Sequence, residues 1–384
     1  MKTSGKAAPL KVLHLHSTFD AGGKERRAVA LMNRFRNGVE HHIVSAQPGA
    51  MGAKGLIDKR VAAFFPFGFP ALAGKLRIAR IQKLARAMQS FDLILTYNWG
   101  AMDAVLAHAV FGPMMGLAPL VHHEDGFNAD ESGGLKRSRN WYRMVALSRA
   151  SALVVPSCQL EDIALTVWRQ PRGRVQRIPN AIDTAAYGRK PKPDVLPRVV
   201  KRAGERWIGT LAGLRAVKNL PRLVRAVPGL PPEWHLVILG EGPERDAIAA
   251  EATRLEIGHR VHLPGHVADP AAAVGLFDLF ALSSDSEQAP LSVIEAMAAG
   301  LAVASPAVGD IAEMVSDANR AFITPPGDDA ALAEAVLALA ADDVLRRRIG
   351  DANRIRARAE YDESVMATRY ASIYAAALGR ASFL

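Results

Sequence analysis

Two carboxylates around one predicted helix start are the residues most able to do chemistry in this sequence. Glu287 lies in the loop SSDSEQAP, and Glu295 lies in the second turn of the helix that Pro290 is expected to begin. The first N–H groups of that helix, at Leu291 and Ser292, form a seat for a phosphate because they have no acceptor within the helix. Glu295 lies roughly 7–8 Å further along the axis, at about 1.5 Å per residue. The spacing predicts a ligand with hydroxyls at both ends and phosphates between them, which is the shape of a nucleotide-sugar.

The elements that must position these acids alternate between strand and helix along the chain. Residues 10–17, LKVLHLHS, predict a buried strand, and a loop with Gly22 and Gly23 leads from it into a helix. That arrangement lets backbone approach a diphosphate, although a glycine pair alone is equally typical of a tight turn. The alternation restarts at WIGTLAG, so we predict an α/β fold of two doubly wound domains. The expected organisation is a first domain over 1–188, a linker rich in proline and charge over 189–206, a second domain over 207–362, and a C-terminal helix over 363–384 that packs back toward the first domain.

The composition is that of a soluble protein large enough for two domains. The chain has 384 residues, of which 49% are hydrophobic and 22% charged, and no run of about 18 apolar residues predicts a membrane span. Its one cysteine, Cys158, excludes an internal disulfide and a cysteine-rich zinc site, and is typical of a reducing, cytoplasmic location. MKTSGKAAPL is followed by a strand with two histidines, so no signal peptide is expected.

The net charge of +10 is concentrated in the first half of the chain. Residues 1–188 hold 25 Lys and Arg against 13 Asp and Glu, which indicates an anionic partner for this half. Residues 64–70 are rich in aromatic side chains, and residues 75–90 predict a basic amphipathic helix. Such a helix is typical of a protein that lies on an anionic bilayer, and more often of an ordinary domain helix with a solvated basic face. Nucleic acid is not an expected partner, because the basic residues are scattered and lack interleaved aromatic platforms.

Several motifs occur in an order that resembles a known enzyme family. GGKERRAVA, PNAID, LRAVKNLPRLVRAV, ILGEGPERDAI, VHLPGHV and SEQAPLSVIEAMAAGLAVA follow one another along nearly the whole chain. Together they resemble the family-4 retaining glycosyltransferases of GT-B fold. The specific part is the pair Glu287 and Glu295, eight residues apart, within the pattern S-x-x-E-x-x-P-x-x-x-x-E-A-M-A-x-G. The resemblance implies two Rossmann-like domains that face a central cleft.

The resemblance also implies a role for each residue that matches the family's motifs. Glu287 would contact the donor sugar near the reaction centre, Glu295 would hold the ribose hydroxyls, and Lys218 would neutralise the leaving diphosphate. The remaining contacts would come from the backbone: sugar and phosphate groups would meet Ala289, Leu291 and Ser292, the base would meet Val267, and Gly22 and Gly23 would close over the phosphates from the other domain.

The sequence departs from the family in two places. Many members carry an arginine five residues before the lysine, where this chain has Gly213, and Arg215 either substitutes for that arginine or is a solvent-facing charge. The family often has a histidine near the sugar in the loop after LVHHE. Here Asp125 stands at that position with His123 upstream, so the sequence leaves open which of the two faces the sugar.

We therefore expect a retaining transfer of a sugar from a nucleotide-diphosphate sugar, UDP- or GDP-linked, to a hydroxyl acceptor. The acceptor is expected to be a glycan or a lipid-linked molecule in cell-surface polysaccharide or glycolipid synthesis, and a soluble acceptor is the alternative. No cofactor and no metal are expected, because no Asp-x-Asp pair is placed to hold a cation. The expected location is the cytoplasm or the inner face of the membrane. Two other classes stay open: an epimerase or hydrolase on the same fold, and a non-catalytic nucleotide-sugar sensor.

Overall fold

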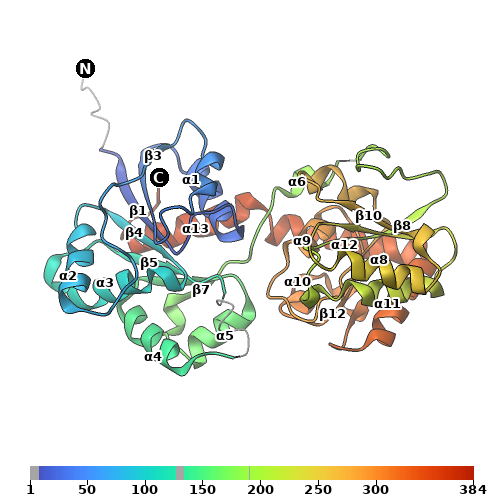
Figure 1. The fold of residues 1–384 in the computed structure, drawn as a ribbon. Helices are drawn as coiled ribbons and strands as arrows, with labels where there is room; N and C mark the ends of the chain where they lie inside the picture. The colour runs from blue at the N-terminus through green and yellow to red at the C-terminus, as the bar shows by residue number, and fades with distance from the viewer. Residues whose placement is uncertain (1–7, 127–133, 190) are drawn as a thin grey trace, which may run out of the picture. The chain divides into compact units, whose positions relative to one another are not determined.

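The chain is described by a computed structural model that covers residues 8–126, 134–189 and 191–384. It folds into two compact units, shown in Figure 1. Unit 1 comprises residues 1–178 together with 367–384, and unit 2 comprises residues 179–366. The segment expected as a linker packs on unit 2, because Leu196 is buried there and Lys201 donates from Nζ to Asp278 at 2.7 Å. The domain limits themselves stay a prediction.

Unit 1 is built on a parallel sheet of seven strands among the described residues, in the order β3-β2-β1-β4-β5-β6-β7. The order reverses between β1 and β4, so loops on the carboxyl side of these two strands diverge and leave room for a ligand. The strands are β1 (Leu10–His16), β2 (Val39–Ser45), β3 (Ala62–Phe64), β4 (Leu93–Tyr97), β5 (Leu120–His123), β6 (Ala152–Val155) and β7 (Val175–Arg177), and the helices are α1 (Gly23–Arg34), α2 (Ile78–Ala87), α3 (Met102–Met115), α4 (Arg137–Ala146), α5 (Cys158–Thr166) and the later part of α13 (Glu363–Ala377).

Unit 2 contains a six-stranded parallel sheet among the described residues, in the order β10-β9-β8-β11-β12-β13. Its order reverses between β8 and β11, which is the corresponding switch point. The strands are β8 (Arg206–Leu211), β9 (Trp234–Leu239), β10 (Val261–Gly265), β11 (Leu279–Ala281), β12 (Val303–Pro306) and β13 (Ile323–Thr324), and the helices are α6 (Thr184–Tyr187), α7 (Leu220–Ala226), α8 (Arg245–Arg254), α9 (Leu291–Ala298), α10 (Ile311–Met314), α11 (Asp329–Ala341) and α12 (Asp343–Glu360).

The sheet of unit 2 is buried on both faces, which explains its nearly continuous hydrophobic strands. Along β9, Val237 and Leu239 belong to one hydrophobic cluster, whereas Leu236 and Ile238 belong to the other. Side chains alternate across a strand, so the two clusters lie on opposite faces of the sheet. The predicted α/β class with two doubly wound units is confirmed. This architecture leaves ligand-binding residues to the loops at the carboxyl ends of the strands.

The amphipathic helix predicted over 75–90 is α2, and its apolar face is part of the core of unit 1. Ile81, Leu84 and Ala85 pack there with Met88, all at most 4% exposed. Arg80 does not face solvent as a free charge, since it pairs with Asp103 and donates to carbonyls of the preceding loop. In no helix of the described residues do length and hydrophobicity together suffice to cross a bilayer.

Candidate functional site

The switch point of unit 2 brings Lys218 and Glu287 together. Lys218 ends a short 3-10 turn after β8, and Glu287 lies in the loop between β11 and α9. The Lys218 Nζ donates to Glu287 Oε1 at 2.5 Å, and the Ser284 hydroxyl donates to the same oxygen at 2.7 Å. Both side chains keep some exposure, 19% for Lys218 and 11% for Glu287. An accessible cation and an acid therefore lie side by side, where the sequence predicts the donor diphosphate and sugar.

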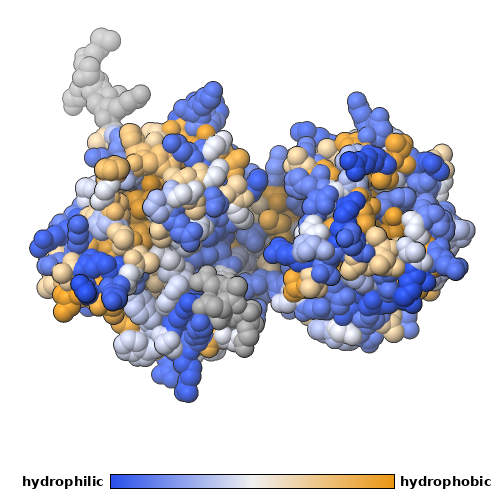
Figure 2. Space-filling view, in the orientation of Figure 1, coloured by the Kyte–Doolittle hydropathy of each residue, from blue (hydrophilic) through white to orange (hydrophobic). Residues whose placement is uncertain are grey.

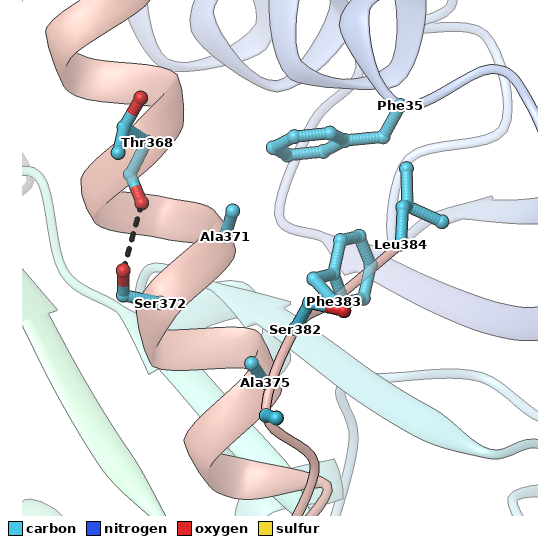
Figure 3. A pocket seen from close by; sticks show the side chains of 9 residues that line it. Phe35, Thr368, Ala371, Ser372, Ala375, Ser382, Phe383 and Leu384 are labelled. Carbon is cyan, nitrogen blue, oxygen red and sulfur yellow. Dashed lines mark hydrogen bonds between the residues drawn. The ribbon is translucent and has the colours of Figure 1, made fainter.

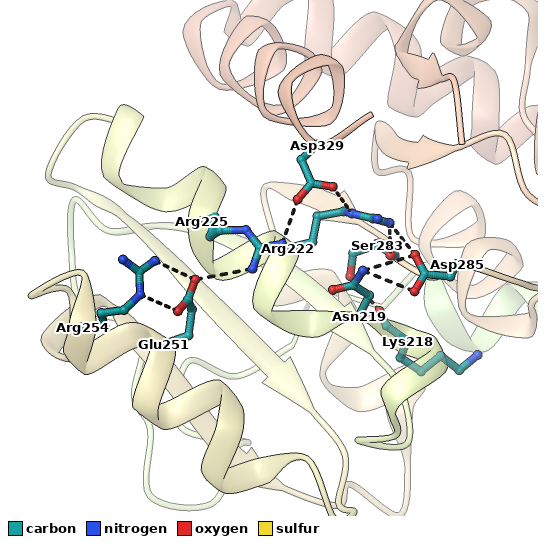
Figure 4. A network of polar contacts seen from close by, with 9 residues as sticks. All are labelled: Lys218, Asn219, Arg222, Arg225, Glu251, Arg254, Ser283, Asp285 and Asp329. Carbon is teal, nitrogen blue, oxygen red and sulfur yellow. Dashed lines mark hydrogen bonds and ion pairs between the residues drawn. The ribbon is translucent and has the colours of Figure 1, made fainter. Parts of the chain in front are cut away.

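Hydrogen bonds and ion pairs join the two loops that carry this pair, one after β8 and one after β11 (Figure 4). The N–H of Asp285 donates to the Val217 carbonyl at 2.9 Å, and the Ser283 hydroxyl donates to the Lys218 carbonyl at 2.9 Å. Arg222, only 8% exposed, donates from Nη1 to the Ser283 carbonyl at 2.9 Å and pairs with Asp285 at 3.0 Å. Lys218 and Glu287 are thus held by contacts that do not involve their own charges.

The turn GEGPE after β9 packs directly against the loop that leads to Lys218. A Cβ at Gly240 would lie 1.9 Å from the Ala212 carbonyl oxygen, and one at Gly242 would lie 2.3 Å from that of Leu214. Both glycines also have positive φ, so no other residue fits at these positions without strain. Beside this turn lies a cavity of about 320 Å³, at the carboxyl ends of β8, β9 and β10. Val267, the predicted contact of the base, lines this cavity.

The start of α9 has the geometry that the sequence predicts for an anion seat. The helix begins at Leu291, one residue later than expected, because Pro290 has an extended backbone and caps it. Leu291 and Ser292 are its first two residues, so their N–H groups have no acceptor within the helix. Leu291 is 37% exposed, and Ala289 in the preceding loop is partly exposed. The helix dipole adds positive potential at this end.

Glu295 is the second carboxylate of the site, and its contact is neutral. It lies in the second turn of α9 and accepts a hydrogen bond of 2.8 Å from the Tyr187 hydroxyl. Burial raises the pKa of Glu295, and the hydrogen bond from Tyr187 acts in the opposite direction. The two acids therefore lie in different environments, because Glu287 is paired with a cation and Glu295 with a phenol.

The turn after β12 packs against the backbone of the loop that carries Glu287. Gly309 has φ +59, and a Cβ there would lie 2.6 Å from the Glu287 carbonyl oxygen and 2.3 Å from that of Gln288. The N–H of Asp310 donates to the same Gln288 carbonyl at 2.7 Å. The position of Glu287 consequently depends on a glycine at 309, which the sequence does not single out.

In unit 1, the predicted phosphate loop precedes α1. Gly22 caps this helix, and a Cβ there would lie 2.8 Å from Glu25 Oε2, whereas a Cβ at Gly23 would meet nothing within 4 Å. Glu25 is 2% exposed, pairs with Lys24 and accepts from the Thr18 hydroxyl at 2.9 Å. Burial lowers the pKa of Lys24 to about 8. The start of α1 therefore already carries a carboxylate of its own. A Cβ at Gly22 would closely approach only the flexible end of the Glu25 side chain, so steric fit requires neither glycine.

Asp125 and His123, the alternatives for the sugar contact, differ in accessibility. His123 is 1% exposed, and its ring nitrogens lie 3.1 Å from the Thr96 carbonyl oxygen and 3.2 Å from the Tyr374 hydroxyl. Asp125 pairs with Arg27 at 2.5 Å and keeps 14% exposure. Burial would raise the pKa of Asp125, but Arg27 outweighs it and lowers that pKa. Asp125 is the ionised and the more exposed of the two.

A second cavity, which lies in unit 1, is lined by no acidic, basic or histidine side chain among the described residues. It has a volume of about 260 Å³ and lies between α13, Phe35 and the C-terminal residues, as Figure 3 shows. Phe35 and Phe383 pack edge to face with ring centroids 5.1 Å apart, and the described side chains that line the cavity are apolar or hydroxyl-bearing. Among the described residues, no group of three or more His, Cys, Asp or Glu side chains is arranged to hold a metal ion.

Sequence reasoning missed the residues that hold the site in place. Tyr187 contacts Glu295 across 108 positions, and Arg222 reaches Ser283 across 61 positions. Neither contact produces a periodic signal, because hydrophobic patterns report which face of an element is buried and not its distant polar partners. Gly309 lies between β12 and α10, where glycine is an ordinary turn signal, but that signal does not mark it as a support of Glu287.

Two family profiles match the chain in adjacent parts. The family described as "Glycosyltransferase Family 4" matches residues 21–186, and the family described as "Glycosyl transferases group 1" matches residues 193–356. The first match therefore lies almost entirely in unit 1, and the second lies within unit 2, which contains Lys218, Glu287 and Glu295.

Individual proteins are also similar to the chain, at sequence identities of 20% to 26% for the three described next. N-acetyl-alpha-D-glucosaminyl L-malate synthase of Bacillus anthracis is 25% identical over 207 residues, which span 53% of this chain and 54% of that enzyme. Glycogen synthase of Mycobacterium tuberculosis is 26% identical over 294 residues, 74% of this chain and 69% of that enzyme. Among solved structures, HepE of Anabaena in complex with UDP has a TM-score of 0.78 at 20% identity, covering 96% of this chain and all of that one. The last likeness confirms the GT-B fold.

The support that Gly309 gives to Glu287 leads to a prediction with a matched control. Gly309→Ala adds a methyl group against two carbonyl oxygens, whereas Gly327→Ala, at φ +79, adds one that meets nothing within 4 Å. Both variants pay about 1–2 kcal/mol for the left-handed backbone. We expect the affinity for a UDP- or GDP-sugar, whichever binds the parent protein, to fall at least about tenfold in Gly309→Ala only, and its melting temperature to fall further than that of the control. Equal affinities in calorimetric titration of the two variants would contradict this role for Gly309.

Proposed function

We propose a function from the premise that the chain belongs to the family 4 and group 1 glycosyltransferases. In this proposal, it transfers a sugar from a nucleotide-diphosphate sugar to a hydroxyl acceptor with retention of the anomeric configuration. The observation that carries the proposal is the Lys218–Glu287 pair beside the start of α9, at the switch point of unit 2. A cation and free helix N–H groups suit a diphosphate, and an acid beside them suits sugar hydroxyls. Glu295, further along the same helix, is the proposed contact of the ribose.

In the proposed reaction, the bond between the anomeric carbon and the diphosphate oxygen breaks as the acceptor hydroxyl attacks the same face of the sugar. Negative charge builds up on the departing diphosphate, which takes up the proton of the hydroxyl. Lys218, Arg215 and the N–H groups of Leu291 and Ser292 stabilise that charge more strongly in the transition state than in the bound donor. Because these groups supply positive charge at the leaving group, we infer that the reaction needs no metal ion.

The remaining donor contacts are proposed from the accessible groups of each unit. The backbone of Val267 meets the base in the cavity of about 320 Å³, and the backbone of Ala289 meets the sugar. In unit 1, Asp125 is the proposed sugar contact, because His123 is buried with both ring nitrogens near other groups. Gly22 and Gly23 are proposed to approach the phosphates. The UDP held by HepE supports UDP as the first nucleotide to test, with GDP as the second.

The function is tested by a donor screen followed by product analysis. A thermal-shift panel of UDP- and GDP-sugars is expected to raise the melting temperature for one donor, because a ligand that binds only the folded state stabilises it by mass action. NMR of the product formed from that donor should show the donor's anomeric configuration.

Lys218→Ala should lower kcat/KM by about 100-fold or more, as loss of a transition-state charge contact does. Arg347→Ala, which removes an exposed cation of α12, should leave kcat/KM unchanged. A loss below threefold in Lys218→Ala, or an inverted product, would contradict the proposal.

The contacts of Gly213 support Arg215 as the substitute for the arginine that the family resemblance implies at position 213. A Cβ at Gly213 would lie only 3.3 Å from Arg215 Nε and 3.6 Å from its Nη2. The Arg215 guanidinium therefore fills the space into which a longer side chain at 213 would extend. Arg215 is exposed, so its donors are accessible to a phosphate.

This arrangement predicts rescue between the two positions. Arg215→Ala should lower kcat/KM by roughly 10- to 100-fold, because a hydrogen bond to a charged group contributes about 1.5–3 kcal/mol. Adding Gly213→Arg should restore most of the loss, since the new guanidinium enters the vacated space, whereas adding Gly213→Ala should not. Steady-state kinetics with the identified donor measure all three variants. If Arg215→Ala alone keeps kcat/KM within twofold, Arg215 is a solvent-facing charge.

The acceptor is proposed to be lipid-linked, and the supporting surface lies just before α2 and at the first residue of that helix. Phe67 is 106% exposed, Leu76 61% and Ile78 81%, and the exposed cations Lys75 and Arg77 lie between them in sequence. Figure 2 shows hydrophobic and hydrophilic residues side by side where Figure 1 labels α2. From residue 59 to residue 91 the chain holds seven Lys and Arg and no Asp or Glu. The apolar face of α2 is buried, so the proposed contact with an anionic membrane is the segment that leads into α2 together with Ile78, the exposed first residue of the helix.

Liposome flotation distinguishes this surface from general stickiness. We expect the parent protein to float with vesicles that contain an anionic lipid and to remain in solution with neutral ones, because basic residues near a bilayer gain about 1 kcal/mol each from anionic lipid. Replacing Phe67, Leu76 and Ile78 by Ser should abolish flotation. Replacing Val344 and Ile355 of unit 2, which are 78% and 71% exposed, should leave it unchanged. Equal recovery with both kinds of vesicle would remove the electrostatic argument.

A further inference from the structure

Tyr187 is a buried tyrosine whose hydroxyl contacts Glu295, the predicted ligand of the ribose. Its side chain is 8% exposed, and its hydroxyl donates to Glu295 Oε1 at 2.8 Å. Burial raises the pKa of Tyr187, with the negative charge of Glu295 as the next cause, so the phenol stays protonated and donates. A carboxylate bonded in this way at one oxygen keeps its other oxygen, Oε2, for a further donor.

The place of Tyr187 is fixed by the contacts of its own short helix. The Asp183 side chain caps α6 by accepting from the N–H groups of Ala185 and Ala186 at 3.1 and 3.2 Å. The Thr184 hydroxyl donates to Asp362 Oδ2 at 2.6 Å, so α6 is tied to the residue just before α13. With its backbone held at both points, the tyrosine has little freedom to follow Glu295 and instead determines where Glu295 lies.

The bond also has a cause in the chemistry of Glu295. Burial takes hydrogen bonds to water away from a carboxylate and raises the pKa of Glu295, whereas the hydrogen bond from Tyr187 acts against that rise. A protonated carboxyl offers one donor and a reduced acceptor, whereas two neighbouring hydroxyls of a ribose need acceptors. A neutral donor such as a phenol satisfies one oxygen without adding a positive charge that would compete for the ligand.

We propose that Tyr187 is a positioning residue that turns Glu295 Oε2 toward the ribose hydroxyls of the donor nucleotide. The proposal rests on the proposed function, in which Glu295 binds the ribose. It predicts that Tyr187 acts only through Glu295, so its contribution to affinity exists for a ribonucleotide and disappears for a nucleotide that lacks the hydroxyl bound by Glu295. A tyrosine that merely fills space would contribute equally to both.

The test is calorimetric titration with UDP or GDP, whichever binds the parent protein, and with its 2′-deoxy and 3′-deoxy analogues. The parent should lose about 10- to 100-fold in affinity on removal of one hydroxyl, the range expected for a hydrogen bond to a charged group. In Tyr187→Phe, the ribonucleotide should bind at least about fivefold more weakly, and the penalty for the deoxy analogue should shrink below threefold. Tyr370→Phe is the control, because the Tyr370 hydroxyl has no hydrogen-bond partner among the described residues and belongs to unit 1.

A double-variant cycle separates positioning from folding. Adding Tyr187→Phe to Glu295→Gln should cost no further affinity if the tyrosine acts through Glu295. A further loss in the double variant, or an unchanged deoxy penalty in Tyr187→Phe, overturns the role of Tyr187 and leaves the proposed function intact. If the parent protein binds the deoxy analogues as tightly as the ribonucleotide, the ribose contact of Glu295 in the proposed function is wrong. Melting temperatures of the variants identify a change that arises from unfolding.

Discussion

The candidate site depends on the attachment between the loop after β8 and the loop after β11. These loops leave neighbouring strands at the point where the strand order reverses, so their backbones would diverge unless something held them. Arg222 supplies that hold, because its guanidinium joins the Ser283 carbonyl, Asp285 and Asp329 from a nearly buried position. Both acids are close to half exposed, and the guanidinium keeps one counter-charge if the other acid is removed, so the attachment depends on the three contacts together and not on a single ion pair. The pairing of Lys218 with Glu287 is a consequence of this attachment.

The sequence predicts the parts of the site that are local. The start of α9, the positions of its two acids and the close turn GEGPE follow from capping residues, proline and glycine within a few positions of one another. The α/β class follows in the same way from alternating periods. The partners of those residues are not local: Glu295 finds its donor in α6, and Lys218 finds its acid 69 positions later. Contacts of that range depend on the packed fold, which periodicity does not describe.

Two sequence interpretations show where side-chain chemistry alone is ambiguous. The pattern of α2 fits a helix on a bilayer, but the same stripe of Ile81, Leu84 and Met88 is needed by the core of unit 1. An amphipathic pattern records only that one face avoids water, so it cannot name the apolar phase. His123 is similar, because a histidine at the end of a buried strand has the chemistry of a ligand contact, yet its neighbours enclose it. Burial lowers its pKa to about 3, so it is neutral, and both ring nitrogens already lie within hydrogen-bond distance of other groups.

The contacts of the two acids indicate which end of the ligand each can tolerate. A carboxylate about 4 Å from a phosphate oxygen meets a repulsion of roughly 4 kcal/mol per unit charge at the effective dielectric near a protein surface. Glu287 can accept that neighbour because Lys218 offsets its charge at 2.5 Å. Glu295 has only the phenol of Tyr187, which orients it without neutralising it, so the distance along α9 must keep it away from the diphosphate. The cation beside one acid and the hydroxyl beside the other thus fit a ligand whose charge lies at the helix start and whose hydroxyls lie beyond it.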